Sequence, residues 1–218
     1  MDPKMIGELN IPNFIKTLAL FNLGNRFLKK QFSKKQSENI ISGIHALSSL
    51  YFSGTNDIYN LRWLSIAYFF HDFIQMFFSK KLNIMKLAYM YHHLSAIYIL
   101  SCDSTKVPIR EIMFWGELSN LSNYPLYYLL HRSNSNTDLI NFFRTLQKFL
   151  FTSIRIPIFT SGIIQYLINR KTNKHLFAMG PVYLMGLIWS IKILKQPYTT
   201  MRLPWAPRLA NNQDTFLD

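Results

Sequence analysis

The chain has 218 residues, of which 49% are hydrophobic and 16% are charged, and its formal net charge is +13. Soluble domains carry about 25% charged residues, so this composition favours a membrane protein, although the mean hydropathy is only +0.05. The basic residues stand in short clusters beside apolar runs, which is typical of cytoplasmic helix ends and argues against a nucleic-acid partner. Cys102 is the sole cysteine, which excludes an intrachain disulfide.

Residues 1–35 are predicted to form a cytoplasmic leader. They show no cleavable signal peptide, because no compact apolar stretch ends in small residues. Apolar residues between 11 and 27 recur at irregular helical spacing and are interrupted by Asn13, Lys16 and Asn22. This pattern predicts an amphipathic helix that lies in the membrane interface rather than crossing the membrane.

Six apolar runs follow, and they predict an all-α, polytopic membrane protein, a bundle or barrel of about six transmembrane helices around a central cavity. Pro108 suits a helix start, Pro157 predicts a bend, and residues 139–149 are predicted to lie in the interface. The alternative is a soluble all-helical protein, since several runs fall short of the ~20 residues that a span needs. The expected spans are about 38–53, 61–79, 84–101, 108–130, 150–168 and 176–195, followed by a polar cytoplasmic tail at 197–218.

The charge distribution predicts that both chain ends are cytoplasmic. Basic residues precede the first span, separate the second from the third and follow the sixth, whereas the segments 54–60 and 102–107 are nearly neutral. One loop disagrees, because Arg170, Lys171 and Lys174 would lie on the far side of the membrane.

Ionisable residues fall near the middle of four expected spans. Because a helix rises about 1.5 Å per residue, these side chains are expected within roughly 5 Å of one plane. Residues three, four or seven apart share a helix face, so each span presents one polar stripe, and the four stripes predict a polar cavity inside the bundle. The residues at these depths are His45, His71, Asp72, His92, His93 and Glu117, and Gln75 and Asn120 extend two of the stripes.

A structural interpretation stands beside the functional one for each of these residues. Asp72 and His71 can form a structural hydrogen-bonded pair, and His45 can join two helices. Arg155, in the fifth span, can neutralise Glu117 or extend its charged head to the cytoplasmic interface.

Five short motifs, taken in order, resemble those of TLC-domain membrane proteins, a family that includes the ceramide synthases and several non-synthase branches. The resemblance covers about residues 36–196 and is greatest for the small non-synthase branch, in which Pro125 would follow the Glu-x-Ser-Asn motif. The motifs are SGIHALS at 42–48, AYFFHD at 67–72, MYHH at 90–93, GELSN at 116–120 and WSIK at 189–192.

The resemblance implies a barrel of six helices around a lipid-sized cavity, in the endoplasmic reticulum. In the synthases the paired histidines, which match His92 and His93, serve acyl transfer from acyl-CoA to a sphingoid amine. The synthases carry an additional aspartate on the following helix, where this chain has Glu117, Ser119 and Asn120, and this departure puts ceramide synthesis in doubt. The Lys-, Asn- and Phe-rich sequence is also compatible with a viral origin and hence a host membrane.

The sequence therefore predicts a protein that senses, binds, moves or remodels membrane lipids. The alternatives are an acyltransferase with acyl-CoA as co-substrate, in which the imidazole acts as base or nucleophile, and a transporter or channel. A haem or metal site is disfavoured because the histidines lack a repeated ligand spacing, so no cofactor and no metal are predicted. The candidate catalytic residues are His92, His93 and Glu117, and the candidate cavity residues are His45, His71, Asp72, Gln75, Ser119, Asn120 and Arg155.

Overall fold

The computed structural model describes residues 11–79, 83–102, 108–132, 136–168 and 173–196, and all regular structure in these ranges is helical. The predicted all-α class is confirmed for this part of the chain. The first ten residues, the tail at 197–218 and the discordant basic residues Arg170 and Lys171 lie outside it. The elements are α2 (Ile11–Leu28), α3 (Lys34–Gly54), α4 (Ile58–Phe77), α5 (Ile84–Leu100), α6 (Ile109–Asn120), α7 (Asn123–Leu130), α8 (Thr137–Leu150), η1 (Phe151–Arg155), α9 (Ile156–Ile168) and α10 (Asn173–Lys195).

Side-chain caps fix the starts of four helices. The oxygens of Ser33, Asp57, Asn83 and Asn136 each accept a hydrogen bond from a backbone N–H in the first turn of α3, α4, α5 and α8. Such bonds satisfy N–H groups that have no partner within the helix. These caps explain why α3, α4 and α8 begin a few residues before the predicted segments, whereas α5 begins where predicted, at Ile84.

The expected fourth span is not one continuous helix. α6 ends at Asn120 and α7 begins at Asn123, so the expected helix over 108–130 is interrupted. Pro125 explains the interruption, because its ring nitrogen cannot donate a hydrogen bond to the carbonyl of Leu121 and its ring would clash with that carbonyl. The two residues between the helices, Leu121 and Ser122, keep αR dihedral angles.

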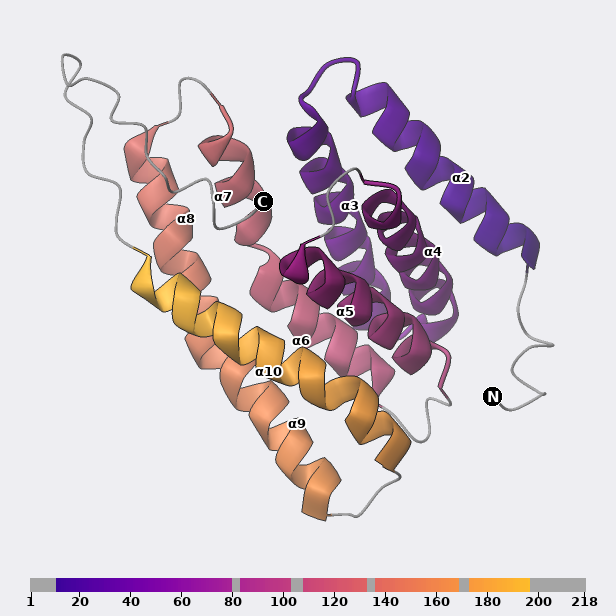
Figure 1. Cartoon of the computed structure of the whole chain (residues 1–218), viewed down its shortest axis with the longest axis vertical. Helices are drawn as coiled ribbons and strands as arrows, with labels where there is room; N and C mark the ends of the chain where they lie inside the picture. The colour runs from indigo at the N-terminus through magenta and orange to yellow at the C-terminus, as the bar shows by residue number, and fades with distance from the viewer. Residues whose placement is uncertain (1–10, 80–82, 103–107, 133–135, 169–172, 197–218) are drawn as a thin grey trace.

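The irregularity expected near Pro157 is present. η1, a single π-helical segment, joins α8 to α9 and ends two residues before Pro157. A π-turn contains one extra residue and leaves room for a proline that lacks an N–H. α8, η1 and α9 thereby form one long bent rod (Figure 1).

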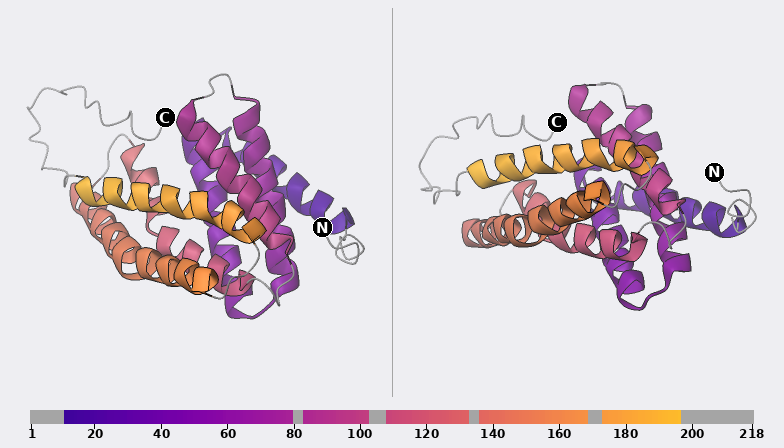
Figure 2. Two further views of the ribbon diagram at one scale, coloured as in Figure 1. Left: turned by 60° about the horizontal axis from the view of Figure 1, so that its bottom comes forward. Right: turned by 90° about the horizontal axis from the view of Figure 1, so that it is seen from below.

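The helices α3, α4, α5 and α6 form the centre of the molecule. α4 packs against both α3 and α5, α3 packs against α6, and α2 packs along the outside of α4 (Figure 1). α10 runs beside α9 and packs on α5, and the other two views show both helices extending away from the central group (Figure 2). The candidate site lies between this central group and the α9–α10 pair.

The surface of the bundle is more apolar than its interior in several places, and α3 shows this most clearly. Its buried residues include Ser37, His45, Ser49 and Ser53, whereas Ile44, Leu47 and Tyr51 on the same helix are exposed. Water-soluble helices have the opposite arrangement, with an apolar face inward. The packing of α3 therefore fits apolar surroundings.

One helical segment among the described residues, Phe177–Lys195, is long and apolar enough to cross a membrane. It lies in α10 and contains Pro181. A helix of 19 residues is about 28 Å long at 1.5 Å per residue, close to the hydrocarbon thickness of a bilayer, about 30 Å.

Candidate functional site

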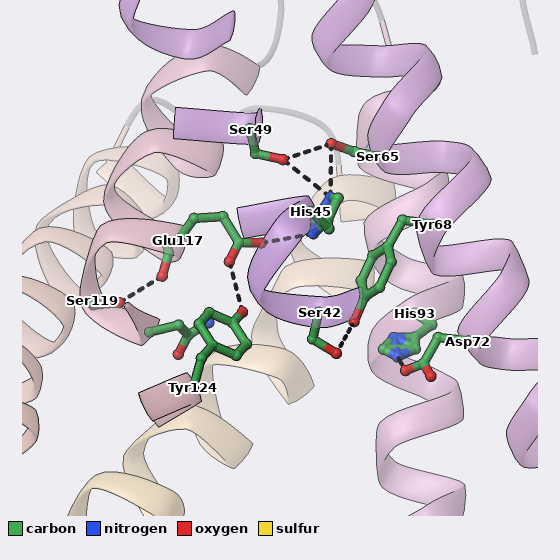
Figure 3. A network of polar contacts seen from close by, with 12 residues as sticks. Ser42, His45, Ser49, Ser65, Tyr68, Asp72, His93, Glu117, Ser119 and Tyr124 are labelled. Atoms are coloured by element: carbon green, nitrogen blue, oxygen red, sulfur yellow. Dashed lines mark hydrogen bonds and ion pairs between the residues drawn. The ribbon is translucent and has the colours of Figure 1, made fainter. Parts of the chain in front are cut away.

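A buried hydrogen-bonded cluster surrounds His45 at the contact of α3 and α4. The Nε2 atom of His45 lies 3.2 Å from the Oγ atom of Ser65 and 3.1 Å from the Oγ atom of Ser49, and the two hydroxyl oxygens are 3.3 Å apart (Figure 3). The ring of Tyr68 stacks on the imidazole with 3.9 Å between centroids. One face and one edge of this histidine are occupied by groups from α3 and α4, so His45 joins the two helices.

Glu117 of α6 lies on the other side of His45. Its Oε1 atom is 3.6 Å from the Nδ1 atom of His45, and its Oε2 atom accepts a hydrogen bond of 3.2 Å from the Tyr124 hydroxyl (Figure 3). Tyr124 is seven residues after Glu117, and Leu121 and Ser122 between them keep helical dihedral angles, so the two side chains share one face. The carboxyl group is thus held by one group on α3 and one on α7.

A second polar contact joins α4 to α5. The Nε2 atom of His93 lies 2.7 Å from the Oδ2 atom of Asp72, and the same imidazole packs against the ring of Phe69 at 5.3 Å (Figure 3). A carboxylate at this distance fixes the orientation of the imidazole. Asp72 therefore pairs with a histidine on the neighbouring helix and not with His71.

His92, next in the chain to His93, has no recorded hydrogen bond among the described residues. Its Nδ1 atom is shielded from solvent and has no partner there. Its ring meets Phe69 edge to face at 6.2 Å. The two adjacent histidines therefore differ, since one is oriented by a carboxylate and the other is not.

Arg155, the last residue of η1, reaches α6. Its Nη1 atom donates to the Oδ1 atom of Asn120 at 2.9 Å and the Oγ atom of Ser119 at 3.1 Å, with the Gly116 carbonyl at 3.5 Å. The guanidinium also lies over the rings of Phe151 and Phe159 at 5.1 and 5.6 Å. Of the two roles predicted for Arg155, neutralising Glu117 or reaching the interface, the first is not realised as a direct ion pair, although the two charges attract each other.

These groups border a partly open cavity of about 590 Å³ that is lined by residues of α3 to α10. Asp72, His92 and His93 line it from α4 and α5, and Glu117 and Arg155 line it from α6 and η1. His45 and Ser119 are fully buried and lie behind this wall. Other polar groups of the lining are Lys35, Glu38, Asn39, Ser42, Tyr68, Tyr89, Asn120, Asn123, Tyr124, Tyr127, Gln147, Tyr183, Lys192 and Gln196.

Besides His45 and Ser119, two further expected cavity residues do not line this cavity. His71 is buried against α2, where its ring lies 6.2 Å from that of Phe21, and Gln75 is absent from the lining. Adjacent residues on a helix point about 100° apart, so Asp72 faces the cavity while His71 turns toward α2. The sequence prediction placed His71 and Asp72 on one helix face. In the structure α2 covers the His71 side of that face, and the Asp72 side borders the cavity.

Sequence reasoning did not identify Ser65, which is fully buried and completes the His45 cluster. A signal was available, because Ser65 lies three residues before Tyr68 and seven before Asp72, on the same helix face. Its role also depends on the approach of α3 to α4, and the sequence of α4 alone carries no information about that contact.

No group of three or more His, Cys, Asp or Glu residues is placed to hold a metal ion in the part of the chain that the structure describes. The prediction that the site uses no cofactor stays a prediction.

Comparison with known proteins found no match: no protein-family model, no curated protein and no solved structure resembles the chain closely enough to be assigned. The chemistry of the site is therefore argued from its own residues.

Proposed function

We propose that the chain is a multi-pass membrane protein of the TLC type that binds a membrane lipid in the cavity and so takes part in lipid sensing, trafficking or composition control. The observation that carries this proposal is the cavity of about 590 Å³ with both charged and apolar walls. Sites for small molecules typically measure about 300–1,000 Å³ and combine an apolar lining with a few polar groups.

The distribution of the lining residues matches an amphiphile. Charged and hydrogen-bonding groups come mainly from the first half of α3, the middle of α4 and α5, the end of α6, α7, η1 and the end of α10. A group of apolar residues comes from the end of α5, the start of α6, α9 and the first half of α10: Ile99, Leu100, Ile109, Ile112, Met113, Phe159, Ile163, Ala178 and Met179. The polar head and the apolar chain of an amphiphile would each contact cavity residues of matching polarity.

Exposed apolar side chains on several helices support the multi-pass arrangement. Large hydrophobic residues are exposed on α4, α5, α9 and α10 as well as on α3, while serines, histidines and Glu117 are buried. Extended apolar surface marks contact with a membrane or a partner, and six spans with cytoplasmic ends account for most basic clusters. The order of the five motifs supports the TLC type, and that type supports a location in the endoplasmic reticulum.

Two variants of α10 test lipid binding. Val182 lines the cavity, whereas Leu184, two residues further on, is 59% exposed. We expect Val182→Trp to fill part of the cavity and lower the amount of co-purified lipid severalfold, and Leu184→Trp to leave it unchanged. Mass spectrometry of lipids extracted from the detergent-purified proteins measures this. Wild-type protein free of bound lipid, or equal lipid content in both variants, would refute the proposal.

A second candidate function, N-acyl transfer from acyl-CoA to a lipid amine, is favoured by the Asp72–His93 contact. A carboxylate that orients an imidazole is the arrangement found beside general bases and nucleophiles. Wild-type protein would then convert labelled long-chain acyl-CoA and a sphingoid base into an amide, and Asp72→Asn and His93→Ala would each reduce the rate at least tenfold. Product no greater than that of a protein lacking both His92 and His93 would exclude this function.

A further inference from the structure

The guanidinium of Arg155 has only uncharged partners in the part of the chain that the structure describes. Its recorded hydrogen bonds to Asn120, Ser119 and Gly116 all engage Nη1, and none engages Nε or Nη2. No carboxylate of the described residues lies within 4.0 Å of it, and Glu117 is instead in contact with His45 and Tyr124.

Burying a positive charge is unfavourable unless an anion contacts it directly. Glu117 borders the same cavity and attracts Arg155 electrostatically, but no ion pair or hydrogen bond joins the two side chains. The guanidinium has five N–H donors in a fixed fork, a geometry that matches the oxygens of a carboxylate or a phosphate. Arg155 therefore lines the cavity with donors that no carboxylate of the described residues engages.

The surrounding backbone holds this side chain in place. η1 ends at Arg155, and π-turns occur often at functional sites because they re-aim side chains. On α10, Gly186 has no side chain, and a Cβ atom there would lie 3.8 Å from the Nε atom of Arg155. The rings of Phe151 and Phe159 flank the charged group and restrict its movement.

We infer that Arg155 binds the anionic oxygen group, a carboxylate or a phosphate monoester, of a single-chain amphiphile whose hydrocarbon chain occupies the apolar part of the cavity. The inference rests on the proposed lipid-binding function and adds to it the charge of the ligand and the residue that recognises it. His92 lines the same cavity and supplies a further nitrogen that has no hydrogen bond among the described residues.

The test compares ligands that share one chain and differ in the head group. Full-length protein, delipidated in a nonionic detergent, is titrated with oleate, oleyl phosphate and oleyl alcohol, and the dissociation constants are measured by native mass spectrometry. Inorganic phosphate is titrated separately, to distinguish an amphiphile from a free anion. The variants are Arg155→Gln, Arg155→Lys and, as a matched control, Arg110→Gln, because Arg110 is exposed, pairs with Glu111 and does not line the cavity.

We expect wild-type protein to bind at least one anionic amphiphile about tenfold or more tightly than oleyl alcohol, a ratio typical of one hydrogen bond to a charged group. Arg155→Gln should abolish this preference without weakening the binding of oleyl alcohol. Arg155→Lys should retain part of the preference, and Arg110→Gln should retain all of it. Equal binding of anionic and neutral amphiphiles by wild-type protein would overturn the inference and leave the lipid-binding proposal intact. Tighter binding of inorganic phosphate than of either anionic amphiphile would also overturn it. Failure of all three amphiphiles to bind would overturn the proposed function itself.

Discussion

At the scale of single residues, the buried histidines have different surroundings and hence different roles. His45 contacts Ser49, Ser65, Tyr68 and Glu117, so both its ring nitrogens and one face of its ring have partners. His93 has one polar partner, Asp72, and borders the cavity. We therefore assign His45 to the stability of the bundle and His93 to the site.

Replacing His45 by Ala should destabilise the protein by about 2–3 kcal/mol, because it opens a space and leaves two buried hydroxyl groups and Glu117 without this partner. Unfolding by denaturant in detergent micelles measures the change. Leu47→Ala, at an exposed position of the same helix, should change the free energy of unfolding by less than about 0.5 kcal/mol. Equal effects of the two substitutions would contradict the role assigned to His45.

At the scale of elements, the approach of α3 to α7 determines where Tyr124 lies. A Cβ atom built on Gly43 would be 3.5 Å from the Cβ and Cγ atoms of Tyr124, and the side chain of Asn39 donates a hydrogen bond of 2.8 Å to the Tyr124 carbonyl. Because Tyr124 in turn donates to Glu117, this helix contact supports the candidate site.

The contact predicts that Gly43→Leu destabilises the protein by about 1–3 kcal/mol, the usual cost of overpacking a close contact. Gly54→Leu is the matched control, since nothing lies within 4 Å of a Cβ atom at the end of the same helix. Thermal unfolding of both variants in detergent, together with their lipid content, measures the effect. The prediction is wrong if Gly43→Leu unfolds at the same temperature as the control.

The sequence was informative about helices and less so about their interruptions. Apolar periodicity placed the third expected span at 84–101, and α5 covers Ile84–Leu100. The apolar run over 108–130 predicts one continuous helix, although Pro125 within it is a residue that interrupts helices. Element boundaries depend on single capping and breaking residues, whereas periodicity averages over many.

At the scale of the whole molecule, the proposed topology places the two ends of α3 on opposite sides of the membrane. α3 has 21 residues and is therefore about 31 Å long, enough to cross the hydrocarbon layer of about 30 Å. Lys30, before α3, and Thr55, directly after it, are both exposed and can carry a reporter group.

Single cysteines at these positions, Lys30→Cys and Thr55→Cys in a Cys102→Ala background, test the topology. We expect a membrane-impermeant maleimide applied from the cytoplasmic side to label Cys at position 30 only, and the same reagent applied from the other side to label position 55 only. Detergent-opened membranes, in which both should react, provide the control. Labelling of both positions from one side would show that α3 does not cross.

The candidate site was predictable in its residue types but not in its pairings. Helical spacing predicted inward-facing polar stripes on four helices; Asp72, His92, His93 and Glu117 border one cavity, whereas His71 and Gln75 of the stripe on α4 do not. The pairing of Asp72 with His93, and of Arg155 with Asn120, depends on how helices distant in the sequence meet. No local pattern encodes such contacts.

The inward polar face of α3 has a consequence for how the proposed membrane protein is made. A segment that carries Lys34, Lys35, Glu38 and His45 is only weakly favoured to leave an insertion channel for lipid by itself. Apart from Ser49 on α3 itself, the polar partners of His45 lie on α4 and α6, which are synthesised later. α3 is therefore expected to remain beside the channel until α4 and α6 emerge. The three helices would then enter the lipid together and not one at a time.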